Sequence, residues 1–263
     1  MINSRIYIKS ASACSPELNL LDAFGLSVNP IDNTLIPGAM RRRTSLTTRI
    51  AITAGTAACI QAQVDPKMLP SVFASLGGEI QVTDALCRLL PDPDALLSPT
   101  QFHNSVHNTT AGYWSILHEC QAPTTAIAGI DDTFALGLLE AWTQLQVTPG
   151  DLLLVCYDES WPQYLAPPIG EQAFACAFVL SSEPDAAQAA LTRPEIYRPT
   201  DPNLAPNLDP SWSKLVDSAP ATAAIPLLSA LSAPRSANNS LIPLNNQGAI
   251  WCTHFEAPPY ANP

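Results

Sequence analysis

Apolar positions along the chain follow two different periods, which predict strands that alternate with helices. Residues 152–157 (LLLVCY) and 173–181 (AFACAFVLS) are continuous apolar runs, a pattern typical of strands buried on both faces. Shorter strands are predicted where β-branched and small residues cluster between turn residues. These shorter strands are residues 2–9, 68–75, 124–128 and 249–255.

Helices are predicted where apolar residues recur every three or four positions behind a capping residue. The clearest has an apolar stripe from Leu46 to Ala58, with Thr44 or Ser45 as its cap. The other predicted helices start at Glu79, at Ser98–Pro99, at Thr109 and at Asp132–Thr133. Strands alternating with amphipathic helices predict a layered α/β domain, with a parallel or mixed central sheet and helices on both faces.

The character of the chain changes after residue 182. Residues 183–210 are crowded with proline and predict a connection with little regular structure. Residues 212–231 predict one or two helices, broken at Pro220 and Pro226, and residues 249–255 predict a last strand that returns to the main sheet. No internal repeat and no second core is evident, so we expect one domain over residues 1–263.

The composition of the chain argues for a partner protein and against nucleic-acid binding. Of the 263 residues, 13% are charged and 47% are hydrophobic, and the formal net charge is -11. Soluble domains usually carry about a quarter charged residues, so part of this surface is expected to lie against a partner. The acidic balance argues against nucleic-acid binding, which requires a basic face.

The seven cysteines and the N-terminal residues indicate a reduced, cytoplasmic protein. No two cysteines form a CxxC pair, and several lie inside apolar runs, which predicts buried free thiols. The first ten residues lack the long apolar core of a signal peptide, and no run is long enough to span a membrane. His103 and His107 are four apart in a predicted helix, but no third ligand is placed beside them. We therefore expect no metal and no cofactor.

Candidate chemistry centres on the turn between the strand at residues 124–128 and the helix that follows, which we call the elbow. The chain has no GxSxG motif and no glycine-rich phosphate loop. Asp131 and Asp132 at the elbow are either a carboxylate pair for acid–base work or, more simply, caps of the following helix. Arg41, Arg42 and Arg43 stand at a predicted helix start and are either a solvated helix entrance or a contact for a carboxylate or phosphate partner. Cations there oppose the helix dipole, which favours the partner.

Several ordered segments resemble the β-ketoacyl synthases of the thiolase-like fold, in their N-terminal half. The matching segments are SPTQFHNSVHNTTAGYWSI, the strand TTAIAG with the helix FALGLLEA, and, upstream, IPGAMRRRTSLTTRIAITAG and VFASLGGEI. The resemblance covers residues 1–182, leaves residues 183–263 as an unmatched extension, and implies a truncated thiolase-like fold. It is strongest to the short synthase-like proteins that accompany ketosynthases in aryl polyene-type pigment biosynthesis.

The departures from this family concern its catalytic groups. The family's nucleophilic cysteine falls at Asp131, and a carboxylate there cannot form the thioester intermediate. The nearest thiol, Cys120, precedes the strand, and His254 is the single histidine after the elbow. The resemblance therefore implies a non-catalytic subunit, similar to a chain-length factor, that pairs with an active β-ketoacyl-ACP synthase.

In such a heterodimer, the strand before the elbow pairs with its counterpart in the partner, and the subunit lines part of the acyl or polyene pocket. The resemblance implies an acyl carrier protein as a further partner, with Arg41, Arg42 and Arg43 as its contact. Two alternatives stay open: a stand-alone binder of acyl groups or acyl carrier proteins, and a malonyl-thioester decarboxylase or hydrolase that uses Asp131 or Asp132. The expected interface and pocket residues are Asn104, His107, Asn108, Tyr113, Trp114, Thr124, Thr125, Ile127 and Phe134.

Overall fold

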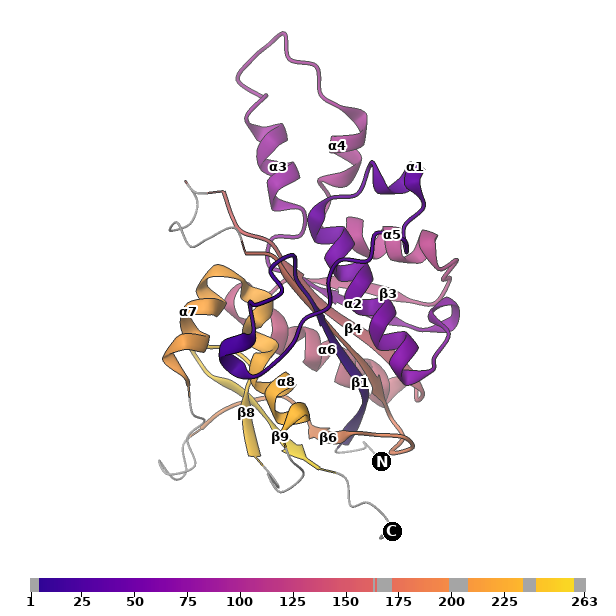
Figure 1. Cartoon of the computed structure of the whole chain (residues 1–263), viewed down its shortest axis with the longest axis vertical. Helices are drawn as coiled ribbons and strands as arrows, with labels where there is room; N and C mark the ends of the chain where they lie inside the picture. Colours follow the sequence, from indigo (N-terminus) through magenta and orange to yellow (C-terminus); the bar gives the residue numbers. More distant parts are fainter. Residues whose placement is uncertain (1–4, 163, 165–171, 199–207, 234–239, 258–263) are drawn as a thin grey trace.

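A computed structural model describes residues 5–162, 164, 172–198, 208–233 and 240–257. Its described strands form one nine-stranded sheet in the order β3-β2-β4-β5-β1-β6-β9-β7, with β8 beside β9 (Figure 1). β2 runs parallel to β3 and β4, and the other pairs are antiparallel. The predicted mixed sheet with helices on both faces is confirmed.

The strands follow the apolar runs of the sequence. They are β1 (Arg5–Cys14), β2 (Ser71–Ala74), β3 (Thr124–Ile127), β4 (Asp151–Asp158), β5 (Phe174–Ser181), β6 (Ala189–Thr192), β7 (Glu195–Ile196), β8 (Ser240–Pro243) and β9 (Trp251–Glu256). β4 and β5 are buried along nearly their whole length, as their continuous apolar sequences predict. β1 extends five residues beyond the predicted end at residue 9, because its alternating side chains stay paired with β5 up to Cys14.

The helices divide between the two faces of the sheet. They are α1 (Gly38–Arg41), α2 (Leu46–Ala62), α3 (Ile80–Cys87), α4 (Pro99–Asn104), α5 (Thr109–Leu117), α6 (Thr133–Val147), α7 (Pro210–Ser218) and α8 (Ile225–Ser232). α2 packs on β1, β5 and β4 with α5 beside it, and α6 covers β2, β4 and β3 on the other face. The core therefore lies in two layers, one on each face of the sheet.

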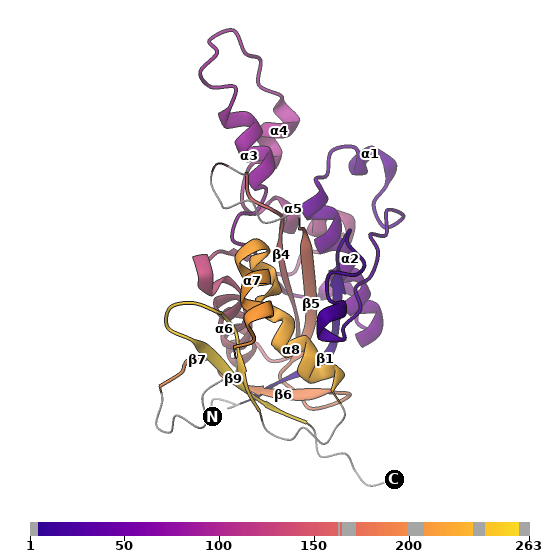
Figure 2. The ribbon, with the colours of Figure 1, turned by 60° about the vertical axis from the view of Figure 1, so that its left-hand side comes forward.

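The C-terminal segment covers the face on which α6 lies. Trp212 of α7 is buried, and its indole Nε1 donates to the carbonyl oxygen of Thr222 at 3.0 Å. Thr222 belongs to a short 3-10 helix, Pro220–Ala224, that contacts α6, β4 and β5. Figure 2 shows α7 and α8 standing in front of this face. Aromatic and aliphatic residues from far along the chain thus complete the second core layer.

Three predictions for the C-terminal part and the cysteines need correction. Residues 183–210 were expected to lack regular structure, but their apolar stretch Ala189–Thr192 pairs with β1 as β6. Pro226 does not break a helix, since it lies in the first turn of α8, where its missing N–H is not needed. All seven cysteines are free as expected, and six are buried, but Cys87 is exposed at the end of α3.

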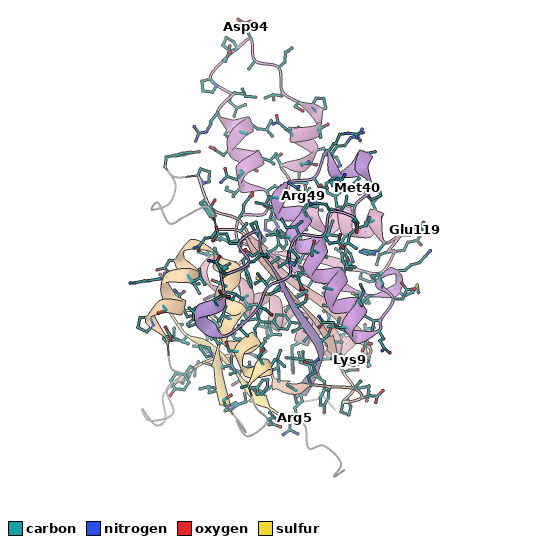
Figure 3. The ribbon with its side chains drawn as sticks, viewed as in Figure 1. Arg5, Lys9, Met40, Arg49, Asp94 and Glu119 are labelled. Atoms are coloured by element: carbon teal, nitrogen blue, oxygen red, sulfur yellow. The ribbon has the colours of Figure 1, made fainter. Side chains whose placement is uncertain are left out.

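α3, α4 and the loop between them project from the body of the molecule, with Asp94 at the far end (Figures 1 and 3). The loop exposes Leu90, Leu96 and Leu97. In the described part of the chain, no helix has the length and apolar character that crossing a membrane requires. The predicted single domain over residues 1–263, with its change of character after residue 182, stays a prediction.

Candidate functional site: the elbow and the open edge of the sheet

β3 is the last strand at its end of the sheet, so one of its edges is open. It pairs with β2 in the register Ser71 to Thr124 and Ala74 to Ile127. The carbonyl oxygens of Pro123 and Ile127 accept from backbone N–H groups at the β2 side. Since backbone groups alternate sides along a strand, the N–H and C=O groups of Thr124 and Ala126 point to the open side. Such a row of unpaired groups is a template for another strand.

The elbow itself is closed by Thr133 and not by an aspartate. The Thr133 hydroxyl accepts from the backbone N–H of Gly129 at 3.0 Å and donates to the carbonyl oxygen of Ile130 at 2.7 Å. A side chain at Gly129 would place Cβ 2.4 Å from Cδ1 of Leu136, so only glycine fits without a shift of that leucine. Ile130 takes a left-handed φ of 52° and is 71% exposed. A left-handed backbone is strained for a β-branched residue, so this turn carries a free-energy cost that the surrounding contacts must offset.

The two aspartates do not cap the helix as the sequence analysis expected. Asp131 is exposed, and Asp132 stands at the N-cap position of α6 but makes no capping hydrogen bond. Asp132 Oδ1 instead accepts from Nδ2 of Asn245 at 2.7 Å. Asn245 is fully buried, and its Oδ1 accepts from the backbone N–H of Trp251 at 2.8 Å. The elbow is thereby tied to the β8–β9 connection, a contact that sequence reasoning missed because the partners are far apart in the chain.

Four of the predicted interface or pocket residues are buried inside this chain. Trp114 packs so closely on α2 that a Cβ at Gly55 would lie 2.8 Å from its ring, and Phe134 packs on Phe178. Tyr113 donates from its hydroxyl to Oδ1 of Asn104 at 3.1 Å, and Nδ2 of Asn104 donates to the carbonyl oxygen of Arg43. The hydrogen bonds of Tyr113 and Asn104 hold α4, α5 and the segment at Arg43 together. The four buried residues therefore position the elements of this surface without being exposed on it.

The remaining predicted residues lie nearer the surface. His107 is half-buried and donates from Nε2 to the carbonyl oxygen of Ser75 at 2.8 Å. Asn108 is exposed before α5, and Thr124, Thr125 and Ile127 lie on the edge strand, with Thr124 the most exposed.

His103 and His107 do not share a helix, because α4 ends at Asn104, so the spacing argument for a shared metal fails. Within the described residues, no group of three histidine, cysteine or acidic side chains is arranged to hold a metal.

Exposed apolar side chains occur on α4, on α5 and at the elbow, and they were not predicted as site residues. They are Phe102 on α4, Val106 after it, Ile116 on α5 and Ile130 at the elbow. α5 contacts β3 directly. Exposed apolar side chains on an element that contacts an unpaired strand, as Ile116 is, are suited to association with another chain.

Arg41, Arg42 and Arg43 are exposed and lie where α1 ends, ahead of α2. Arg41 belongs to the last turn of α1, where a cation is favourable, and Ser45 caps α2 by accepting from the N–H of Thr48. Arg41 therefore does not oppose the dipole of α1, whereas Arg42 and Arg43 precede the cap of α2 as expected, and the acidic partner stays a prediction. The Arg41 guanidinium donates to the carbonyl oxygen of Asn33 at 2.8 Å, and in the described part of the chain no carboxylate pairs with any of the three arginines.

A buried group of carboxyls lies where β2 and β4 end, and sequence reasoning missed it. Asp158 Oδ1 accepts from the Ser75 hydroxyl and from the N–H groups of Leu76 and Gly77 at 2.9 to 3.2 Å. Desolvation by burial raises the pKa of Asp158 to about 7, against the lowering effect of these donors. Burial likewise raises the pKa of Glu159 to about 7.

Glu79 is the third buried carboxyl. Its Oε1 accepts from the hydroxyls of Ser45 and Thr48, and burial raises its pKa. Oε2 of Glu79 and Oδ2 of Asp158 have no hydrogen-bond partner among the described residues. The sequence signal for this group was the acidic pair Asp158 and Glu159, which directly follows the apolar run 152–157. The pattern alone does not show that both side chains are buried in the folded chain.

Comparison with known proteins places this geometry in a family. A family model described as the β-ketoacyl synthase N-terminal domain matches residues 23–223, more than half of the chain. No curated protein sequence matches.

Three solved structures share the fold over nearly the whole chain. A chain of the ketosynthase (ApeO) in complex with its chain length factor (ApeC) from Xenorhabdus doucetiae is 18% identical, with coverage of 97% of this chain and 100% of that one and a TM-score of 0.68. A chain of the ishigamide ketosynthase/chain length factor is 14% identical, covers 96% and 99%, and has a TM-score of 0.70. A chain of AntDE:AntF, a type II PKS acyl-carrier protein in complex with its ketosynthase, is 13% identical, covers 97% and 99%, and has a TM-score of 0.71. The predicted truncated thiolase-like fold is confirmed.

Proposed function

The chain belongs to the β-ketoacyl synthase N-terminal domain family, and from that premise we propose that it is a non-catalytic subunit of a cytoplasmic ketosynthase heterodimer. In this role it resembles a chain-length factor: it pairs with an active β-ketoacyl-ACP synthase and shapes the pocket for the acyl or polyene chain in aryl polyene-type biosynthesis. Two of the similar solved structures are ketosynthases with chain length factors, which supports this pairing.

The open edge of β3 is the observation that carries the proposal. The outward N–H and C=O groups of Thr124 and Ala126 can pair with the same strand of a synthase subunit. β3 is short, but it contains no charged residue, no proline and no bulge, which are three of the devices that protect natural edges. Ile116 lies on α5, which contacts β3, and Ile130 follows the strand at the elbow; both are exposed apolar side chains.

The elbow supports a subunit without condensing chemistry of its own. Neither Ile130 nor Asp131 offers a thiol, and Cys120 lies before β3, buried and directed at the carbonyl oxygen of Leu69 at 3.6 Å. Asp132 is the second acid of the alternative hydrolase or decarboxylase, and its carboxylate already accepts a hydrogen bond from the Asn245 amide. The active-site cysteine therefore belongs to the partner.

The three arginines support a contact with an acyl carrier protein through the complex. Arg41, Arg42 and Arg43 are a quarter of the 12 lysines and arginines in a chain of net charge -11, and all three are exposed. An unpaired cationic cluster in an acidic protein attracts an acidic partner, mostly by accelerating encounter.

Blocking the edge tests the pairing. Ala126→Pro removes one outward N–H, which an edge strand tolerates because its own ladder does not use that group. Ala126→Ser keeps the N–H and is the matched control. Each variant is co-expressed with a ketosynthase that has an elbow cysteine, and native mass spectrometry measures the complex. We expect wild type and Ala126→Ser to form the heterodimer, and Ala126→Pro to stay unpaired with an unchanged circular dichroism spectrum.

Two results would overturn the proposal. One is a folded Ala126→Pro variant that assembles as well as wild type, and the other is a ketosynthase that extends chains normally without this subunit. Asp131→Asn tests the enzyme alternative in the same complex. Condensation should be retained in that variant, and its complete loss would assign direct chemistry to Asp131.

A further inference from the structure

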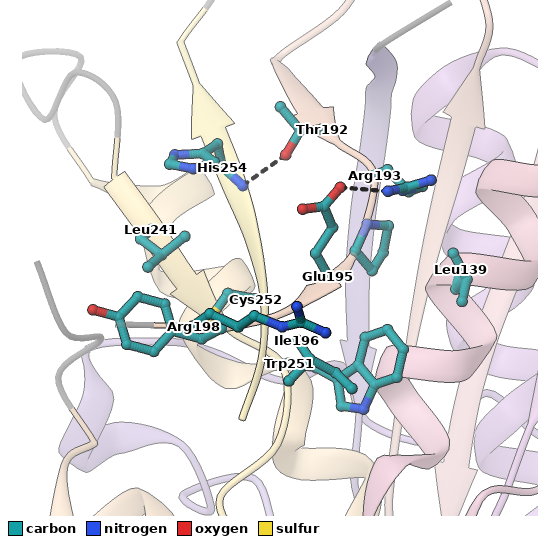
Figure 4. A pocket seen from close by; sticks show the side chains of 12 residues that line it. Leu139, Thr192, Arg193, Glu195, Ile196, Arg198, Leu241, Trp251, Cys252 and His254 are labelled. Atoms are coloured by element: carbon teal, nitrogen blue, oxygen red, sulfur yellow. Dashed lines mark hydrogen bonds and ion pairs between the residues drawn. The ribbon is translucent and has the colours of Figure 1, made fainter. Parts of the chain in front are cut away.

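A cavity lies at the other end of the sheet from β3, and most of its lining residues follow β5 in the chain. It is a cavity of about 810 Å³ formed by the β6–β7 connection, β8, β9 and one residue of α6 (Figure 4). Small-molecule sites usually measure about 300–1,000 Å³ and combine apolar walls with a few polar groups. The apolar walls here come from Leu139, Ile196, Leu241 and Trp251.

The charges of the cavity are opposite in sign to those of the whole chain. Arg193 and Arg198 line it together with Glu195, a net formal charge of one positive in a protein of net charge -11. Arg193 is already engaged, since its Nη2 lies 2.6 Å from Oε1 of Glu195 and its guanidinium faces the Trp142 ring at 5.9 Å. Within the described residues, no carboxylate lies at ion-pair distance from Arg198. Figure 4 shows the Arg198 side chain reaching across the cavity.

This combination selects one class of anion. A guanidinium presents parallel donors that match a carboxylate bidentately, and the indole of Trp251 is a flat apolar wall for a ring. Glu195 would repel a second negative charge, so a monoanion fits better than a phosphate dianion. We propose that this cavity binds an aromatic monocarboxylate, with Arg198 holding the carboxylate and Trp251 contacting the ring. The site is independent of the β3 edge and goes beyond the proposed pairing with a ketosynthase.

Calorimetric titration of the full-length chain with three matched probes tests the inference. 2-Naphthoate has the ring and one charge, 2-naphthylmethanol has the ring alone, and 2-naphthyl phosphate has the ring and a dianion. We expect 2-naphthoate to bind one to one and to bind at least about tenfold more tightly than 2-naphthylmethanol, the usual minimum for a hydrogen-bonded charge. Arg198→Met should abolish this difference, whereas Lys214→Met, an equal charge change at an exposed position of α7, should leave it intact.

The remaining variants separate the roles of the charges. Glu195→Gln should favour 2-naphthyl phosphate relative to 2-naphthoate, and Arg198→Lys, which keeps the charge without the fork, should lose only part of the preference. Ala126→Pro should bind 2-naphthoate like wild type, because the edge and the cavity are at opposite ends of the sheet. The inference is overturned by undetectable 2-naphthoate binding, by equal binding of 2-naphthylmethanol, or by equal affinities of folded Arg198→Met and Lys214→Met.

Discussion

Asp158 offers a direct test of the electrostatics at the end of β4. The substitution Asp158→Asn removes its charge and keeps an acceptor for the Ser75 hydroxyl and the two backbone N–H groups. The amide mimics the protonated carboxyl, which is the form that burial favours. We expect this substitution to change how the stability of the protein depends on pH.

The magnitude follows from the two pKa values. Burial raises the pKa of Asp158 from 3.8 to about 7, which corresponds to about 4 kcal/mol of preference for the neutral form in the folded state. Between these two pKa values the folded chain keeps a proton that the unfolded chain has lost. The unfolded state binds fewer protons, so the free energy of unfolding falls as pH rises from about 4 to about 7 and then levels off. Glu159 acts in the same direction, because burial raises its pKa from 4.5 to about 7.

Urea denaturation at pH 5 and pH 8 measures the effect. Wild type should lose several kcal/mol of unfolding free energy between the two values. Asp158→Asn should lose about 3 kcal/mol less, because only the part of the window between pH 5 and about pH 7 lies inside the measured range. Asp94→Asn, at the tip of the projecting loop, removes the same charge from an exposed position and should follow the wild-type profile. Parallel profiles for wild type and Asp158→Asn would refute the reasoning, as would a wild type that is more stable at pH 8 than at pH 5.

Three further substitutions, one of them with a matched control, test the packing and a buried hydrogen bond by chemical denaturation. Gly137→Ala should destabilise the fold by about 1–3 kcal/mol, because the new Cβ would lie 2.7 Å from Cβ of Ala74. The control Gly112→Ala replaces a helical glycine with open space around it and should be neutral or stabilising by up to about 1 kcal/mol. Equal effects of the two substitutions would contradict the close α6–β2 contact. Trp212→Ala should cost about 3–5 kcal/mol and expose the C-terminal segment to proteolysis, since the indole is buried in the second core layer; unchanged protease resistance would argue against that cover. Asn245→Ala should cost about 1–3 kcal/mol, because it leaves buried partners at the elbow without their hydrogen bonds; an unchanged denaturation midpoint would contradict this role.

Predictions from the sequence succeeded where a signal was local. The apolar runs of β4 and β5 could be located because both faces of these strands are buried, which leaves no polar alternation to obscure them. Ser45 and Ser98 cap their helices as expected, since a cap depends on residues within one turn. Asp132 did not cap α6, because a distant asparagine competes for its carboxylate.

The candidate site was predicted only in part for the same reason. The edge strand and the elbow follow from a short β-branched run, a glycine and a helix, all within residues 124–142. Whether Trp114 faces a partner or its own core depends on α2, which presents Gly55 to its ring. A helical pattern shows that a residue is apolar, but it does not show which neighbour covers it.

By itself, the sequence determined the alternation of strands and helices, the acidic and charge-poor composition, and the lack of a thiol at the elbow. Only the tertiary structure decided that β3 has an open edge, that Asp158 and Glu159 are buried, and that residues 210–232 cover the face on which α6 lies. The physical reason is the range of the interactions. Periodicity and capping act within a few residues, whereas strand order, desolvation and the bond between Asp132 and Asn245, 113 positions apart, depend on segments that meet only in the folded chain.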